Sequence, residues 1–433
     1  MPPISGLPAS ILEKIFTLFC PHCHPPRSSS TYWGMYCNDS CPIGRPEHER
    51  RLTLANLCLT NKTLNSVATP ILYHRFHRRN EITFARTLFK WRPDLTQHVK
   101  SLHLGSDDEL TFTSGNDEVV LKEVMTHFDH LRISQDEPKE DESMLLSLLI
   151  GKCTDIEDLC LTVTWNGYDP VPFCPPGSLR NLKRLSLSHW DDNGGFDLAY
   201  ATEIFLAAPN ITSVFAYAVI EVGMGLKMAN VTEITLRNSF LQIDAFNRLL
   251  KQLPSLEKLT YYGGDAGIMD GETPPRARDM QEAILKHAPR LKFLKLLMLE
   301  DDNSYYRDDG ITDEDMIRSL RGLEQLQELR LDAQYLVVPC YEEYETDMEP
   351  RTLVNMLPDS IRLVGIECGY STCSTRTLLP AILELGRVCQ VEFPHLRSMR
   401  VSILDDLEEA RERFESNAVE LITEFLLIEK LEP

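Results

Sequence analysis

The chain has 433 residues, of which 43% are hydrophobic, 25% charged and 8% aromatic. These fractions are close to those of ordinary globular proteins, so they exclude a collagen-like or wholly disordered chain. No apolar run reaches the roughly 18 to 20 residues that a membrane-spanning helix needs, and the N-terminus lacks the basic start of a secretory signal. We therefore expect no membrane partner and an intracellular protein of the cytoplasm, the nucleus or both.

Charge is distributed unevenly along the chain. Of its 44 Lys and Arg and 65 Asp and Glu, residues 1–104 hold 13 and 6, a net charge of +7, which leaves 31 and 59 for residues 105–433, a net charge of −28. Phosphate backbones bind proteins mainly through Lys and Arg, so nucleic acid is not an expected partner of the acidic part. We expect the basic part to suit an acidic partner and the acidic part to suit a basic protein.

The first elements in chain order are short helices within residues 1–80, which we call the head. Pro8 suits a first helical turn, and four apolar residues then fall on one helix face: Ile11, Leu12, Ile15 and Phe16. Further apolar residues, among them Leu57 and Leu72, predict one or two more short helices. Helices this short bury little surface, so the head is expected to need a partner.

The segment 20–50 is inserted between these helices, is rich in Pro, Ser and Gly and is predicted to be a loop. It holds four closely spaced cysteines, with His22, His24 and His48 nearby: Cys20, Cys23, Cys37 and Cys41. Two pairs of thiolates can enter one tetrahedral zinc site, so a structural zinc is one interpretation, and a loop that simply carries free cysteines is the other. A catalytic zinc is not expected, because nothing nearby supplies a general base.

After a linker predicted at residues 81–98, the pattern apolar-x-x-apolar-x-apolar occurs eleven times. Its first positions are Val99, Phe128, Ile156, Leu182, Ile211, Val231, Leu256, Leu291, Leu326, Ile361 and Leu396, and the last four intervals are 35 residues each. Each copy predicts one short strand, and helical spacing between copies, as at 243–253 and 316–323, predicts helices. A strand and a helix of about 30 residues cannot bury their apolar faces alone, so neighbouring copies must share a core. Residues 99–404 are therefore predicted to be an α/β solenoid of irregular strand-helix repeats with a curved parallel sheet.

The remaining segments complete this picture. Residues 405–433 are predicted to form a helix that caps the last repeat, since Leu407, Phe414, Leu421 and Ile428 recur at heptad spacing. Polar stretches at 135–143, 301–315 and 341–349 are predicted to be acidic surface loops. No phosphate-binding Gly loop, nucleophile elbow or His-Glu-x-x-His motif occurs, so no enzymatic activity is expected.

Two parts of the chain resemble known families. Residues 99–404 resemble leucine-rich repeats of the longer, helix-containing kind, although the Asn or Cys that this family places after each strand is not maintained. The head resembles the F-box as it occurs in filamentous fungi. This second resemblance rests on Leu7-Pro8, Ile11-Leu12 and Ile15-Phe16, on the Leu-Cys-Leu-Thr-Asn-Lys segment at 57–62, and on the segment from Val67 to Phe76.

The F-box resemblance implies that the head docks on the Skp adaptor of a cullin-RING ubiquitin ligase. The docking residues that it implies are Leu7, Pro8, Ile11, Leu12, Ile15 and Phe16, with Leu57 and Leu72 in support. The repeats would then select the protein to be ubiquitylated. The alternative is a leucine-rich-repeat binding or inhibitory scaffold that acts outside ubiquitylation, and copurification of the adaptor distinguishes the two.

Overall fold

The computed structural model describes residues 6–24, 44–77, 81–105, 141–163, 174–189, 194–264, 275–298, 312–337, 348–367, 375–402 and 407–424. Cys37, Cys41, the repeat copy that begins at Phe128 and most of the three polar stretches lie outside these ranges. The chain divides into two compact units, which are described separately. Unit 1 comprises Met1–Trp190 and Tyr200–Phe215, and unit 2 comprises Asp191–Ala199 and Ala216–Pro433.

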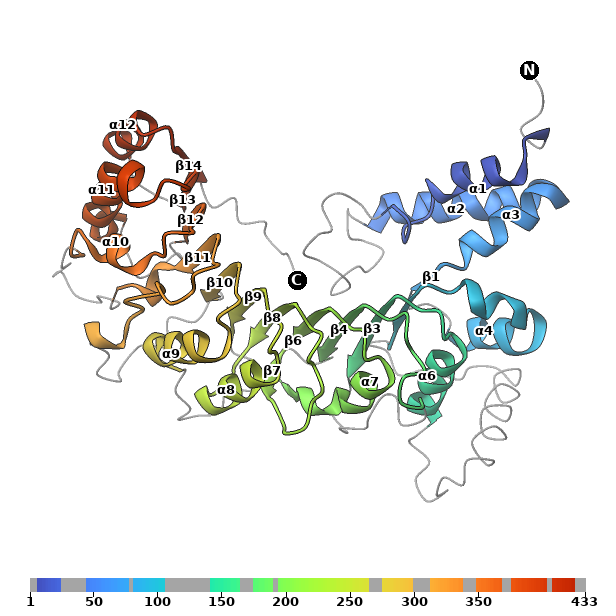
Figure 1. Ribbon diagram of the computed structural model, residues 1–433. Helices are drawn as coiled ribbons and strands as arrows, with labels where there is room; N and C mark the ends of the chain where they lie inside the picture. Colours follow the sequence, from blue (N-terminus) through green and yellow to red (C-terminus); the bar gives the residue numbers. More distant parts are fainter. Residues whose placement is uncertain are drawn as a thin grey trace. The chain divides into compact units, whose positions relative to one another are not determined.

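The head forms three helices, α1 (Ala9–Thr17), α2 (Gly44–Thr60) and α3 (Lys62–Leu72) (Figure 1). Asn61 caps α3, since its side chain accepts a hydrogen bond of 2.9 Å from the Leu64 backbone N–H. The helices enclose a small core of Leu12, Phe16, Cys20, Leu54, Leu64, Ala68 and Ile71. Since α2 begins at Gly44, the final residues of the segment predicted as a loop are helical instead.

The range 81–98, predicted as a linker, is folded. It contains α4 (Glu81–Arg86), a π-helical turn (Thr87–Trp91) and a 3-10 turn (Pro93–His98). Leu88 and Leu95 are buried there. Further along unit 1 are α6 (Asp141–Lys152) and α7 (Thr202–Ala207).

Twelve strands in the described ranges form one parallel sheet, and their order in the sheet is their order in the chain. The first five are β1 (Arg75–His77), β2 (Ser101–Leu104), β3 (Asp158–Val163), β4 (Arg184–His189) and β6 (Ser213–Tyr217). Those of unit 2 are β8 (Glu233–Ser239), β9 (Lys258–Gly263), β10 (Phe293–Met298), β11 (Glu328–Asp332), β12 (Leu363–Glu367), β13 (Ser398–Ser402) and β14 (Glu420–Glu424). A separate pair joins β5 (Phe196–Asp197) to β7 (Val219–Glu221).

The strands of unit 2 are in register, one repeat against the next. Successive strands place one apolar residue each at the same height: Leu259, Leu294, Leu329, Val364, Met399 and Leu421. All six are buried. Between the strands run α8 (Ile243–Lys251), α9 (Ala277–His287), α10 (Thr352–Met356), α11 (Thr375–Glu392) and α12 (Glu408–Ser416) (Figure 1). Ten of the eleven predicted copies coincide with strands, so the expected repeating parallel sheet is confirmed for the described residues.

Two predicted helices are not found as expected. Thr312 and Asp315 do form a capping box, but the helical turn Asp313–Asp315 goes no further. The backbone N–H groups of Ile317 and Leu320 instead donate to the carbonyls of Tyr335 and Met356 in neighbouring segments. In the described part of the predicted capping helix, residues 407–424, the helix α12 ends at Ser416 and the chain then adds β14 to the sheet beside β13. In both cases bonds to a neighbouring repeat replace bonds within a helix.

A buried tyrosine satisfies two backbone groups in one turn of the sheet. The buried Tyr261 hydroxyl donates to the Ser239 carbonyl over 2.9 Å and accepts from the Leu241 backbone N–H over 3.2 Å. These two backbone groups belong to the turn after β8. A side chain from the next strand therefore satisfies them.

Candidate metal centre

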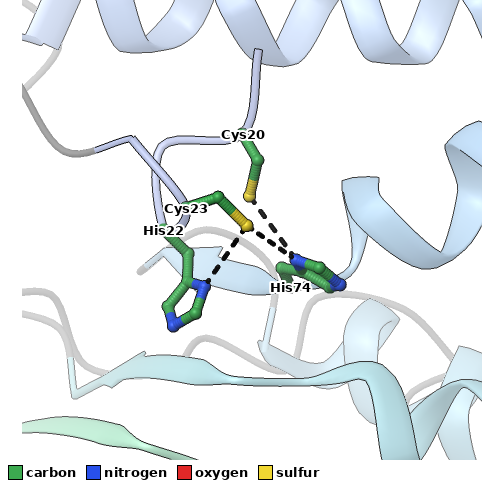
Figure 2. Close-up of side chains that lie close together, drawn as sticks. All are labelled: Cys20, His22, Cys23 and His74. Atoms are coloured by element: carbon green, nitrogen blue, oxygen red, sulfur yellow. Dashed lines mark hydrogen bonds between the residues drawn. The ribbon is translucent and has the colours of Figure 1, made fainter. Parts of the chain in front are cut away.

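The candidate metal centre consists of Cys20, His22, Cys23 and His74. The first three lie in one turn just after α1. The Cys20 backbone N–H donates to the Thr17 carbonyl over 3.0 Å, and the His24 N–H donates to the Cys20 carbonyl over 3.0 Å. This tight turn brings the side chains of Cys20, His22 and Cys23 to the same place (Figure 2). The Cys-x-His-Cys spacing is short enough for a single turn to supply three ligands.

The fourth residue, His74, comes from the junction between α3 and β1. Its carbonyl accepts hydrogen bonds of 2.8 Å from the backbone N–H groups of both Lys100 and Ser101, which lead into β2. Its own N–H donates to the Ile71 carbonyl over 3.2 Å at the end of α3. His74 is therefore fixed by the packing of the head on the first strands of the sheet.

The ligand atoms of these four residues all lie within 4.8 Å of one another. The Nδ1 atom of His74 is 3.6 Å from the Cys20 Sγ and 3.5 Å from the Cys23 Sγ, and the Nδ1 of His22 is 3.8 Å from the Cys23 Sγ (Figure 2). A tetrahedral zinc with bonds of about 2.3 Å to sulfur and about 2.0 Å to nitrogen separates its ligand atoms by roughly 3.3 to 3.8 Å. The three sulfur–nitrogen separations are close to those of such a shell, and with all four ligand atoms within 4.8 Å of one another the residues could hold a tetrahedral metal ion. Two thiolates and two imidazoles are a donor set that selects zinc.

The protonation of these groups favours metal binding. A hydrogen bond from Cys23 lowers the pKa of Cys20 to about 4, helped by His74 and opposed by burial. Cys20 is therefore a thiolate near neutral pH. Burial lowers the pKa of His22, which keeps its imidazole neutral, as a ligand must be. The hydrogen bond to Cys20 raises the pKa of Cys23, so this thiol would release a proton on binding a metal.

The other side of the His22 ring meets two carboxylates. Its Nε2 is 3.8 Å from an oxygen of Asp158 and 3.9 Å from one of Glu157, at the start of β3. Asp158 is buried and is held by Arg184, whose Nη2 donates to it over 2.7 Å. A carboxylate behind a histidine fixes the orientation of the ring and makes it a better ligand. The cluster is thereby connected to β3 and β4.

Sequence reasoning found half of this site. Cys20 and Cys23 were predicted as ligands, and His22 was recognised only as a nearby residue. His74, which lies 51 residues beyond Cys23, was not predicted. The other predicted ligands, Cys37 and Cys41, are outside the described residues. The usable signal was the compact Cys-x-His-Cys turn, which needs one further ligand from a distant segment.

The residues predicted to contact an adaptor are divided between the surface and the core of the head. Pro8 and Ile11 are exposed, whereas Leu12 and Phe16 are completely buried in the head core. The others pack against that core and are partly buried: Leu7, Ile15, Leu57 and Leu72. Three exposed apolar residues of the head were not predicted: Leu18, Leu52 and Leu59.

Comparisons with known proteins add little to this geometry. No family model matches the chain, and no curated protein matches it. Among solved structures, a crystal structure of a Bacteroides fragilis protein, determined as a structural-genomics target, is similar over 72% of this chain and 84% of its own, with 13% sequence identity and a TM-score of 0.30. Among the described residues, no helix is both long and apolar enough to cross a bilayer.

Proposed function

We propose that the chain is a substrate receptor of a Skp-cullin-F-box ubiquitin ligase, which binds the Skp adaptor through its head and a protein substrate through its repeats. The observation that carries this proposal is a pair of exposed apolar stripes on the head. Ile11 and Leu18 are 41% and 55% exposed, and Leu52 and Leu59 are 52% and 85% exposed. Each pair is seven residues apart, which is two helical turns, so its members lie on one helix face.

The head does not need these four side chains for its own core. That core is closed by Leu12, Phe16 and their neighbours, all of which are nearly inaccessible to water. Large apolar side chains that remain exposed over a completed core are typical of a protein-protein interface. Of these four residues, Ile11 is among the docking residues that the F-box resemblance implies, and the other three extend that set.

We further propose that the Cys/His cluster holds a structural zinc ion. The ion would join the turn after α1 to the junction before β1, and it would supply stability rather than catalysis, because the two thiolates and two imidazoles fill a tetrahedral shell. Such an ion would hold the head on the first strands of unit 1 while the adaptor is bound.

The experiment is copurification of the adaptor with variants of the full chain. Truncation of a central apolar anchor costs about 2 kcal/mol or more, so Ile11→Ser with Leu18→Ser should reduce adaptor recovery by well over tenfold. A matched control is Met224→Ser with Val391→Ser, which changes two residues of unit 2 that are 82% and 84% exposed. Phe16→Ala is unsuitable, because its loss would open the head core.

The outcomes separate the two candidate functions. Loss of the adaptor in the head variant alone supports the proposal. Normal recovery with the head variant would show that these stripes are not the docking surface. A wild-type chain that never copurifies with the adaptor would favour the alternative, a leucine-rich-repeat scaffold outside ubiquitylation.

A further inference from the structure

The outward side of the sheet in unit 2 carries a row of cations. On these strands, buried residues alternate with partly exposed ones, so the second set faces away from the core. Lys295 on β10 lies opposite Arg330 on β11, and Arg330 lies opposite Gly365 on β12. Gly365 in turn lies opposite Arg400 on β13. We call Lys295, Arg330, Gly365 and Arg400 the basic row.

This row places cations on successive strands. Lys295 and Arg330 lie directly opposite each other on strands about 4.8 Å apart, and Glu367 and Glu328 pair with them. The row also stands out chemically, because residues 105–433 carry a net charge of −28. A row of cations in a part of the chain with a strongly negative net charge indicates a ligand of opposite sign.

Acidic and aromatic neighbours hold the cations in place. The Nζ of Lys295 is 3.4 Å from a Glu367 oxygen, and the Nη2 of Arg330 is 2.7 Å from a Glu328 oxygen. The Nε of Arg330 also donates to Glu328 over 2.8 Å. A guanidinium has five N–H donors, so a ligand carboxylate can bind without displacing Glu328.

Tyr262 on β9 lies beside the row, two residues beyond Thr260, which is the residue opposite Lys295. The Lys295 Nζ lies 4.9 Å from the centre of the Tyr262 ring, and the Arg237 Cζ lies 5.0 Å from it. These are cation-π distances, so the ring positions both cations. Cations already held in one geometry lose less side-chain entropy when they bind a ligand.

Gly365 leaves space within the row. A Cβ atom at this position would lie 3.1 Å from the Cγ of Arg330 and 3.6 Å from its Cβ. A larger residue would crowd the Arg330 side chain. With glycine there, no side chain intervenes between Arg330 and Arg400, which are two strands, or about 10 Å, apart.

We propose that the basic row binds an acidic, extended segment of a protein partner, with ligand carboxylates paired to Lys295, Arg330 and Arg400. Within the proposed function this partner is the substrate, so the inference names the charge of the segment that the repeats select. It differs from the basic partner that net charge alone predicts. The reason is that contacts within a few ångströms depend on local charge, whereas more distant charges are screened beyond about 10 Å at 0.1 M salt.

The test is binding of labelled peptides to the full chain, which does not require the adaptor. The probe is a fluorescein-labelled peptide of alternating Glu and Gly, with Gln-Gly and Lys-Gly peptides of equal length for comparison. The triple variant K295Q/R330Q/R400Q should bind the Glu-Gly peptide at least about tenfold more weakly than wild type at about 50 mM salt.

A charge-matched control separates the row from net charge. The variant R278Q/R387Q/R411Q removes three exposed cations from α9, α11 and α12 and should bind the Glu-Gly peptide nearly as tightly as wild type. Thermal unfolding should show that the row variant remains folded, since the three cations are partly exposed and lie outside the apolar core. If the triple variant unfolds, Arg330→Gln alone should still weaken binding.

Three results would overturn the inference. They are equal binding of the Glu-Gly and Gln-Gly peptides, equal weakening in both triple variants, and preference of the wild type for the Lys-Gly peptide. Loss of adaptor copurification leaves these peptide results unchanged, so the failure of the proposed function and the failure of this inference are distinguishable.

Discussion

The Sγ of Cys20 lies 3.6 Å from the Nδ1 of His74, although 54 residues separate them in the sequence. A metal ion bound by both would close that stretch of chain into a loop. Closing a loop of this length restricts the unfolded chain, which is how cross-links stabilise small domains. The pair therefore connects the chemistry of the cluster to the stability of the head.

The first prediction concerns the metal content. Purified full chain should carry about one zinc ion per molecule, and either Cys23→Ser or His74→Ala should remove it, because a structural shell needs all four ligands. Metal analysis of protein prepared without chelator checks this. His24→Ala is the matched control, since His24 is exposed at the end of the same turn. Zinc that depends on Cys37 and Cys41 but not on His74 would contradict the ligand set.

The second prediction concerns the carboxylate behind His22. Asp158→Asn should weaken zinc binding by about 10- to 100-fold, which is the usual effect of losing such a partner. Competition with a zinc-binding dye measures the affinity. Arg184→Gln is the control, because it breaks the ion pair of Asp158 but retains the carboxylate. If both variants bind zinc like wild type, Asp158 has no part in the site.

The third prediction concerns the buried hydroxyl of Tyr261. Tyr261→Phe should lower the free energy of unfolding by about 2 to 4 kcal/mol, because it leaves the Ser239 carbonyl and the Leu241 N–H buried without their partner. Tyr262→Phe, on the outward side of the same strand, should have little effect. Urea unfolding compares the two, and equal stability would mean that the turn finds other partners.

The fourth prediction is a pH dependence. Burial raises the pKa of Asp332 to about 7, against about 3.9 in an unfolded chain. Between these values the folded chain keeps a proton that the unfolded chain has released. The contribution of Asp332 to stability is therefore fully present below about pH 4 and is lost as the pH rises through about 7.

Asp332→Asn tests this sign, since the amide retains an acceptor for the Gln334 N–H, which lies 3.0 Å from the carboxylate. The variant should gain stability relative to wild type by a few kcal/mol between pH 5 and pH 8, at about 1.4 kcal/mol for each unit of pKa. The control is Asp359→Asn, at an exposed position, which should change the free energy of unfolding by the same amount at pH 5 and at pH 8. A stability difference for Asp332→Asn that is the same at both pH values would show that this carboxyl is ionised in the fold.

The sequence by itself determined the repeating part of this protein. The apolar pattern around Leu256, Leu291, Leu326 and Ile361, with its 35-residue interval, predicts the strands and their stacking in one sheet. The physical reason is that each repeat buries its apolar face only against the next, so local periodicity and tertiary packing carry the same information. The helix at 243–253 was predictable for the same reason.

Only the tertiary structure decided the features that depend on contacts between distant segments. The segment 316–323 has helical spacing, yet its backbone groups bond to neighbouring repeats, and β14 adds to the sheet where a helix was expected. His74 joins Cys20, His22 and Cys23 because the head packs on the first strands, a contact that no local pattern specifies. The basic row of Lys295, Arg330 and Arg400 also becomes visible only when strands 35 residues apart lie side by side.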